Sequence, residues 1–394
     1  MVPALQPAVQ CLHDNAAFPH VLIVVDSLAE PIGGGERIIL KLASLLPDYG
    51  YRVSILTFHG PIDAEVRASP PCPIYFLPLT SAFNVSALRA AFCLRRFLRD
   101  HDVAIVQTFF ESSDLWAGLV TKVTSSARLI WSRRDMGILR VRKHRLAYRV
   151  LADMPDRVFA VAELVRKHCI EVDRIDPRKV DTIYNGLDPK EWSPIPSSPR
   201  TNGEIHITTV GHVRHVKGHD VFVRAAAEIA KLHPEATFSI AGAALDSAYF
   251  QYLQTLIRDL GLTHRFYLAG AVRDLQSHLA QSDIFVLPSR SEGFSNAIVE
   301  AMAMSLPVVA TDVGGNAEAV SHGVSGFIVQ PDDPQAVAEA ILRLLDDPGR
   351  ARAMGEVGRQ MVREQFTIGT MMSCVTRAYG EVLACGTPAH SVSG

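Results

Sequence analysis

Cysteine is sparse in this chain of 394 residues, and its six copies are scattered without a C-x-x-C pair. This spacing favours reduced thiols in a cytosolic protein over a disulfide framework. A charge excess is also absent, because the net charge is only -2, so we expect no nucleic-acid partner. No apolar run is long enough to span a membrane, and residues 1–19 lack the basic start and apolar core of a signal peptide. These absences predict a soluble, cytoplasmic protein.

Several catalytic signatures are missing as well. No set of Cys and His residues has zinc spacing, so we expect no metal site of that kind. The sequence contains neither G-x-x-x-x-G-K-[ST] nor G-x-S-x-G, which argues against kinase-like and serine-hydrolase chemistry. The glycine-rich loop at 26–35 is not the G-x-G-x-x-G fingerprint, so a nicotinamide cofactor is not expected.

Apolar, strand-like runs alternate with helical patterns along the chain, which predicts α/β domains with parallel sheets. The length allows two or three domains, each with its own core. In the first half, strands are expected at 20–25, 53–58, 74–77, 103–107, 129–132 and 158–161, and helices at 36–46, 87–98, 114–123, 141–151 and 163–172. In the second half, strands are expected at 205–210, 237–241, 265–268, 283–288, 308–310 and 326–329, and helices at 221–232, 297–303, 336–345 and 350–366. We therefore expect a first domain at 1–188 and a second at 204–369.

A proline- and serine-rich segment, 189–203, separates the two halves and is predicted to be the interdomain linker. It follows the turn residues Asn185 and Gly186. A last helix is expected at about 370–384.

The stretch 291–300 combines a buried strand, a tight turn and a helix that Ser295 can cap. Free backbone amides at such a helix start, together with the helix dipole, favour a phosphate or diphosphate. Glu292 lies in the turn and would face the group that the diphosphate carries. Glu300 lies about 7 Å further along the helix, where it can reach ribose hydroxyls.

Two further loops have chemistry that suits a diphosphate. Residues 33–35 are three glycines that precede a helix, and glycines either let a ligand approach the backbone or only turn the chain. Residues 211–220 follow a predicted strand and contain Arg214 and Lys217. Two cations beside a helix start can neutralise charge on a departing nucleotide; the alternative is that they are surface cations without a ligand.

Taken in their order along the chain, these motifs resemble those of the retaining glycosyltransferases of family 4, the "group 1" transferases with the GT-B fold. The similarity includes Gly33-Gly34-x-Glu36, Gly211 with Lys217-Gly218, Glu292 to Glu300, and the run through Pro307 to Gly314-Gly315. It covers about residues 20–383, including the turn at 185–188 and the terminal helix, which in the family crosses back onto the first domain. The resemblance implies two Rossmann-like, doubly wound domains facing a cleft, the first binding the acceptor and the second the nucleotide sugar.

The resemblance also implies a reaction. A hexosyl group would pass from a UDP- or GDP-sugar to a saccharide or lipid-linked acceptor with retained configuration, in the synthesis of a cell-surface polysaccharide or glycolipid. Because no D-x-D triplet is present, a metal-bound diphosphate has no sequence support, and no cofactor is implied. The catalytic residues would be Arg214, Lys217 and Glu292. Substrate-binding residues would be Gly33, Gly34, Arg133, Arg134, Gly293, Phe294, Ser295, Asn296 and Glu300.

The sequence departs from the family's pattern at two places that bear on these roles. His212 stands where family members often have the arginine, which is why Arg214 takes that role here. Histidines frequent in the first domain are replaced at 107–109 and 132–135, where Arg133 and Arg134 take a histidine's position. A nucleotide-sugar epimerase on the same fold and a non-catalytic carbohydrate-binding subunit are therefore the alternatives.

The stretch 133–149 is strongly basic, with seven Lys and Arg residues opposed only by Asp135. Such a helix can meet an anionic membrane face or the phosphate of a lipid carrier, and it can equally be a solvated helix face. It allows peripheral contact of a cytoplasmic protein with the inner face of the membrane.

Overall fold

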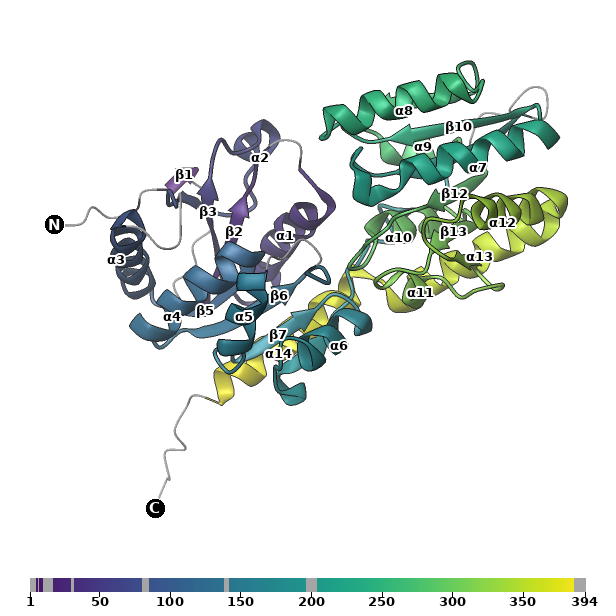
Figure 1. Ribbon diagram of the computed structural model, residues 1–394. Helices are drawn as coiled ribbons and strands as arrows, with labels where there is room; N and C mark the ends of the chain where they lie inside the picture. Colours follow the sequence, from purple (N-terminus) through teal and green to yellow (C-terminus); the bar gives the residue numbers. More distant parts are fainter. Residues whose placement is uncertain are drawn as a thin grey trace. The chain divides into compact units, whose positions relative to one another are not determined.

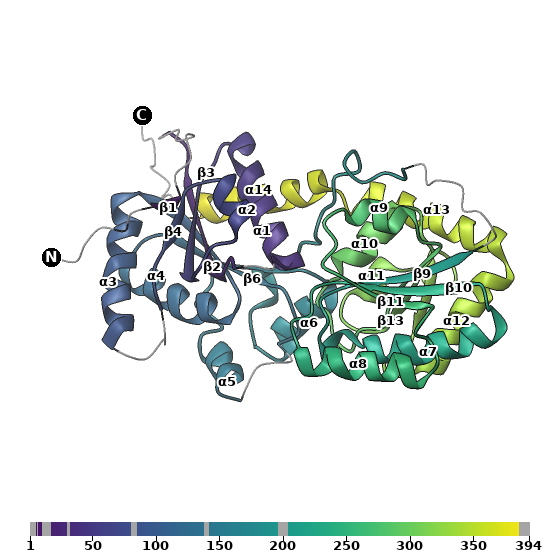
Figure 2. The same ribbon diagram turned by 90° about the horizontal axis from the view of Figure 1, so that it is seen from above.

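The computed structural model describes residues 5, 7–9, 17–29, 32–79, 85–137, 142–195 and 204–385. The chain forms two compact units, Met1–Tyr184 together with Met371–Gly394, and Asn185–Thr370. Their elements are drawn in Figures 1 and 2. Residues 196–203 of the predicted linker lie outside the described residues, as do residues 138–141 of the basic stretch.

The first unit contains an eight-stranded sheet in the order β1-β4-β3-β2-β5-β6-β7-β8. β1 pairs antiparallel with β4, and the other neighbours pair in parallel. The strands are β1 (Pro7–Val9), β2 (His20–Ser27), β3 (Arg52–His59), β4 (Ile74–Phe76), β5 (Val103–Phe109), β6 (Arg128–Arg133), β7 (Arg157–Ala160) and β8 (Val180–Thr182). The winding direction reverses between β2 and β5, as in a doubly wound fold.

Helices cover both faces of this sheet. The crossovers place α1 and α2 on one face and α3, α4, α5 and α6 on the other, and Figure 2 shows the same arrangement. The helices are α1 (Gly34–Leu45), α2 (Ala64–Ala68), α3 (Val85–Asp100), α4 (Gly118–Thr124), α5 (Arg142–Val150) and α6 (Glu163–Glu171), with a π-helical turn at Ser113–Ala117 before α4.

The last helix, α14 (Ile368–Ala384), starts in the second unit, and its part from Met371 onward packs on the first. Its fully buried Tyr379 stacks on Phe159 at 6.2 Å between ring centroids and hydrogen-bonds the side chain of Gln107. The chain therefore returns to the first unit's sheet after completing the second.

The second unit contains a six-stranded parallel sheet in the order β11-β10-β9-β12-β13-β14. The strands are β9 (Ile205–Val210), β10 (Ala236–Ala241), β11 (Phe266–Gly270), β12 (Ile284–Leu287), β13 (Val308–Thr311) and β14 (Gly326–Val329). The helices are α7 (His219–Leu232), α8 (Ser247–Asp259), α9 (Leu275–Ala280), α10 (Asn296–Ala303), α11 (Asn316–Ala319), α12 (Pro334–Asp346) and α13 (Pro348–Gln365). With two doubly wound α/β units present, the predicted fold class is confirmed.

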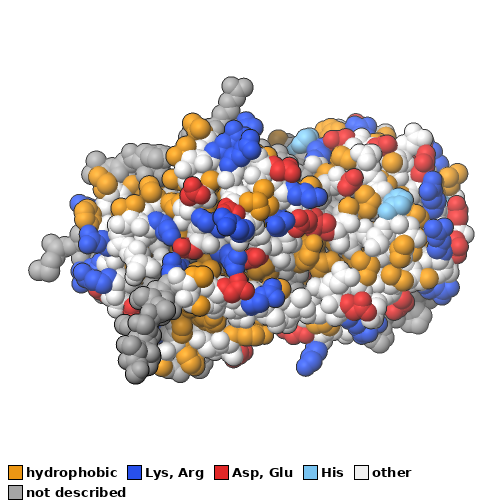
Figure 3. All heavy atoms as spheres, turned by 90° about the horizontal axis from the view of Figure 1, so that it is seen from below, with side chains coloured by type: hydrophobic (Ala, Val, Ile, Leu, Met, Phe, Trp, Pro, Cys, Tyr) orange, Lys and Arg blue, Asp and Glu red, His pale blue; other side chains and the backbone are white. Residues whose placement is uncertain are grey.

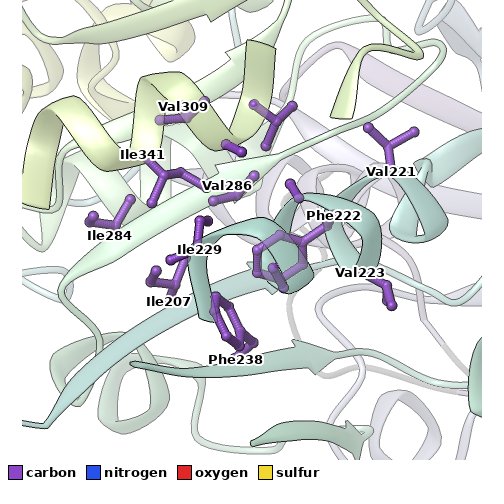
Figure 4. Packing of buried hydrophobic residues seen from close by; sticks show 14 of the residues in the cluster. Ile207, Val221, Phe222, Val223, Ile229, Phe238, Ile284, Val286, Val309 and Ile341 are labelled. Carbon is purple, nitrogen blue, oxygen red and sulfur yellow. The ribbon is translucent and has the colours of Figure 1, made fainter. Parts of the chain in front are cut away.

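The core of the second unit lies between its sheet and the helices α7, α8 and α12. Figure 4 shows Phe222 of α7 beside Phe238 of β10 and Ile207 of β9. The rings of Phe222 and Phe238 meet edge to face with centroids 6.0 Å apart. The central strands β12 and β13 are buried along their whole length, and they are nearly continuous apolar runs rather than alternating ones.

The sequence analysis did not predict the strand β1 or the helices α2, α8, α9 and α11. The signals for α8 and α9 are their caps: Asp246 accepts a hydrogen bond from the amide of Tyr249, and Asp274 from that of Ser277. Within the described residues, no helix is both long and apolar enough to cross a membrane.

Candidate functional site

The second unit's sheet reverses its winding between β9 and β12, which are neighbours. The chain leaves β9 towards β10 and leaves β12 towards β13, so the loops after these strands diverge at the carboxyl edge. Ligands of doubly wound folds bind at this point. The loop after β9 carries Arg214 and Lys217, and the loop after β12 carries Glu292.

The structure joins two of these residues directly. Lys217 Nζ donates to Glu292 Oε1 at 2.7 Å, and the Ser289 hydroxyl donates to the same oxygen at 2.7 Å. The Lys217 side chain is 26% exposed and that of Glu292 is 10% exposed, so both are only partly open to solvent. Sequence reasoning gave them separate partners in a ligand, and their mutual ion pair was not predicted.

Glycines let these loops pack closely. Gly218 has a φ of +64°, and a Cβ added there would lie 2.0 Å from the carbonyl oxygen of Pro288. Gly314 has a φ of +54°, and its Cβ would lie 2.1 Å from the carbonyl oxygen of Glu292. Both positions therefore require glycine for conformation and for space.

Arg290 ties the two loops together. Its Nη1 and Nη2 donate to the two carboxylate oxygens of Asp220, each at 2.9 Å, and Nη1 also donates to the carbonyl of His215 at 2.7 Å. The Tyr249 hydroxyl donates to Asp220 at 2.5 Å. The hydrogen bonds to Arg290 and Tyr249 outweigh burial and hold the pKa of Asp220 below its ordinary value. Arg290, Asp220 and Tyr249, which we call the Arg290 clamp, thus fix the turn that carries Lys217.

Two more groups beside this turn differ in charge. The Arg214 side chain is exposed and has no hydrogen bond or ion pair with the described residues. His219, at the start of α7, is fully buried, and burial together with the nearby Lys217 lowers its pKa to about 3. His219 is therefore neutral near pH 7, and the positive charge here comes from Arg214 and Lys217.

The start of α10 contains the remaining predicted residues of this unit. Ser295 occupies the cap position as expected, but its side chain makes no capping hydrogen bond, which corrects the capping role. Phe294 is buried against Phe366, with ring centroids 5.3 Å apart. Asn296 accepts a hydrogen bond from Asn185 at 2.6 Å, and Gly293 accepts one from the amide of Gly315. Glu300 is 9% exposed on the helix's next turn.

In the first unit, the predicted glycines lie at the start of α1. Gly33 occupies the cap position of this helix and Gly34 is its first residue. Arg134 follows β6 and is half-buried. Burial lowers its pKa to about 10, while the carboxylates of Glu36 and Asp135 act in the opposite direction. Arg134 is thus electrostatically linked to the G-G-x-E motif.

Arg133 has different surroundings, because its side chain is 2% exposed and pairs with the buried Asp173 at 3.2 Å. Its guanidinium also stacks on the Tyr148 ring, 4.2 Å from the centroid. Tyr148 in turn donates to the buried Asp114 at 2.9 Å. This geometry gives Arg133 a place in an internal network, whereas Arg134 is only half-buried.

Sequence reasoning missed both networks, the Arg290 clamp and the cluster of Arg133, Asp173, Tyr148 and Asp114. The residues of each network come from different helices, strands and loops, and no spacing in the sequence predicts that they meet. Among the described residues, no group of three or more His, Cys, Asp and Glu side chains is arranged to hold a metal ion.

Two family models match the chain in succession. The model described as Glycosyltransferase Family 4 matches residues 32–191, and Glycosyl transferases group 1 matches residues 192–361.

Individual relatives point the same way. The chain is 35% identical over 175 residues to a lipopolysaccharide core biosynthesis mannosyltransferase of Rhizobium leguminosarum bv. viciae, covering 44% of this chain and half of the relative. It is 25% identical over 361 residues to the UDP-Gal:alpha-D-GlcNAc-diphosphoundecaprenol alpha-1,3-galactosyltransferase of Escherichia coli, covering 85% of this chain and 89% of that one. The match to a D-inositol 3-phosphate glycosyltransferase of Corynebacterium kroppenstedtii, at 31% identity over 54% of this chain, again spans half of the relative.

Solved structures share the fold. Anabaena HepE in complex with UDP has a TM-score of 0.80 at 20% identity, covering 92% of this chain and all of that one. The sucrose-phosphate synthase of Thermosynechococcus elongatus has a TM-score of 0.81 at 21% identity, covering 93% of this chain and all of that one. Since the two domain models together cover most of the chain in the order of a GT-B protein, the chain belongs to the group 1 glycosyltransferases of family 4.

Proposed function

We propose that this protein transfers a hexosyl group from a UDP- or GDP-sugar to a saccharide or lipid-linked acceptor, with retained configuration and without a metal ion. The observation that carries the proposal is the meeting of Lys217 and Glu292 at the carboxyl edge of the second sheet, at its switch point. Two relatives support the substrate class by name, a mannosyltransferase of lipopolysaccharide core biosynthesis and a galactosyltransferase that uses a UDP-sugar. The product would be a cell-surface polysaccharide or glycolipid.

In this proposal, Lys217 and Arg214 bind the donor diphosphate. Both cations lie in the turn before α7, and the N-terminal end of the α10 helix dipole adds a partial positive charge. As the bond to the sugar breaks, negative charge grows on the diphosphate, and preorganised cations stabilise it. Lys217 would then exchange its contact with Glu292 for one with the phosphate.

Glu292 and Glu300 would bind the two ends of the donor. Glu292 and the backbone at Gly293 would orient the hydroxyls of the sugar, with Phe294, Ser295 and Asn296 shaping this turn. Glu300 would accept hydrogen bonds from the ribose. Glu292 would therefore orient the sugar and not act as a nucleophile. The acceptor hydroxyl would attack from the face that the diphosphate leaves, and the departing phosphate would take the proton.

The acceptor would bind the first unit at Gly33, Gly34 and Arg134. Arg134 is half-buried beside the G-G-x-E motif and keeps a cation there for a polar or anionic acceptor. Arg133, which is paired with Asp173, would position the end of β6 rather than touch the acceptor.

The test is a screen of the purified protein against nucleotide sugars for binding, followed by assays of nucleotide release. We expect release only when an acceptor is present. Interconversion of donor sugars without an acceptor would identify an epimerase, and tight binding with neither reaction would identify a carbohydrate-binding subunit. Analysis of the anomeric configuration of the product tests retention.

A further inference from the structure

Three helices of the first unit expose apolar side chains in pairs. The helices α3, α4 and α5 lie on the same face of its sheet, as Figures 1 and 2 show. The pairs are four residues apart and so lie one above the other on each helix. They are Leu88 and Phe92 on α3, Leu119 and Val123 on α4, and Leu146 and Val150 on α5.

The inner sides of these helices are apolar as well, because Leu94, Phe97 and Tyr148 are buried towards the sheet. The paired residues on the outer sides are 45% to 74% exposed. Single exposed apolar residues are ordinary on a protein surface, but several on one helical layer mark a site of interaction. We call these three pairs the apolar pairs.

Positive charge surrounds the apolar pairs. Among the described side chains of α3, α4 and α5, seven Lys and Arg residues stand against a single acid, Asp100. The basic residues are Arg89, Arg95, Arg96, Arg99, Lys122, Arg145 and Arg149. Arg96 and Arg99 pair with Asp100, and Lys122 pairs with Asp156 outside these helices, so the other four carry the positive charge that no described acid pairs with. The whole chain has a net charge of -2, so the remaining residues carry an excess of negative charge and the positive charge is concentrated on this layer. On the first unit in Figure 3, Lys and Arg side chains lie among hydrophobic and some acidic ones.

We propose that this layer binds the surface of an anionic lipid bilayer, with the apolar pairs inserted among the acyl chains and the basic residues at the headgroups. Apolar residues flanked by Lys and Arg are the pattern that lies in a membrane interface. A second copy of the chain is a poor occupant, because a two-fold interface would bring the same cations against each other. The proposal extends the predicted role of the basic stretch from α5 to three helices and depends on neither donor nor acceptor.

The experiment measures flotation of the full-length protein with two kinds of vesicle, phosphatidylcholine alone and phosphatidylcholine mixed with phosphatidylglycerol. We expect binding to the mixed vesicles that weakens as salt is added. The double variant Leu146→Ser with Val150→Ser should bind at least about tenfold more weakly, since each side chain gives up apolar burial. Arg95→Glu with Arg145→Glu should reduce binding to anionic vesicles about tenfold or more and remove the preference for them.

The second unit provides matched controls. Leu232 at the end of α7 is 66% exposed, close to the 64% of Leu146, and Arg343 on α12 is exposed as Arg145 is. Leu232→Ser and Arg343→Glu should leave vesicle binding unchanged. All these positions are exposed, so the variants should fold, and thermal unfolding checks this. Absence of binding to anionic vesicles, an equal loss in the controls, or a dimer that the apolar variants dissociate would each overturn the proposal.

Discussion

Lys217 and Glu292 are 75 residues apart in the sequence, and their side chains meet in an ion pair of 2.7 Å. One follows β9 and the other follows β12, the two strands between which the winding of the second sheet reverses. In this geometry the cation and the carboxylate neutralise each other. A diphosphate that competes for Lys217 would release Glu292 at the same moment.

Replacement of Lys217 by alanine tests its catalytic role. If Lys217 stabilises charge on the departing diphosphate, Lys217→Ala should lower kcat roughly 10²–10³-fold and raise the donor KM less. Loss of the ion pair should cost about 1–3 kcal/mol of unfolding free energy, because the largely buried carboxylate of Glu292 loses its cation. Steady-state kinetics and thermal unfolding give both values. Lys231→Ala, at an exposed lysine of α7, is the control, and a kcat within a few-fold of the parent would direct attention to Arg214 and His212.

The Arg290 clamp makes a second prediction. Arg290→Met leaves the carboxylate of Asp220 without its main partner and loosens the turn that carries Lys217. We expect a loss of about 1–3 kcal/mol in stability and a lower kcat at nearly unchanged KM. Asp332→Asn removes the other ion pair of Arg290. The Asp332 side chain is 60% exposed, so this variant should lose under about 1 kcal/mol of stability. Similar effects of the two variants would contradict the clamp.

Glu300→Gln should weaken binding of the free nucleoside diphosphate. An amide accepts ribose hydroxyl protons less well than a carboxylate, and hydrogen bonds to a charged group contribute roughly 1.5–3 kcal/mol. Calorimetric titration measures the affinity, with Glu339→Gln on the exposed side of α12 as the control. Equal affinity of Glu300→Gln and the parent would refute the ribose role.

Activity should persist in excess chelator, because the proposed mechanism neutralises the diphosphate with side chains and helix amides. The measurement is nucleotide release before and after incubation with EDTA. A complete loss that added magnesium or manganese restores would show that the diphosphate site includes a metal.

The buried Asp114 predicts a pH dependence of stability. Burial raises its pKa from the ordinary 3.8 to about 8, against the attraction of Arg133 and the hydrogen bonds from Thr108 and Tyr148. The folded protein therefore keeps this carboxyl protonated near neutral pH, whereas the unfolded chain releases the proton. The stabilising contribution is complete below about pH 4 and is lost progressively as pH rises to about 8.

Asp114→Asn removes this titration while keeping a polar group of similar shape. The variant should gain stability relative to the parent between these pH values, by up to about 1.4 kcal/mol per pH unit. Urea unfolding of both proteins at several pH values measures the difference. A constant difference across the range would mean that Asp114 is ionised in the folded state.

Local patterns in the sequence determined the fold class and named the candidate residues of the proposed donor site. Apolar runs and helical periodicity predicted parallel sheets in both halves. Turns rich in glycine placed Lys217 and Glu292 in the loops after strands, and Glu300 on the helix that follows. These signals are readable because they depend on neighbours within a few residues. The helices α8 and α9 were not predicted, because the local signal for each is one capping residue, Asp246 or Asp274, among other polar residues.

Only the tertiary structure decided which of these residues meet. Arg133 and Arg134 are adjacent in the sequence, yet one is buried against Asp173 and the other is half-exposed near Glu36. Likewise, Arg290 binds Asp220 from 70 residues away, and no local pattern specifies that pairing. The reason is physical: an ion pair depends on the order and winding of the strands, which bring distant loops to one edge of a sheet.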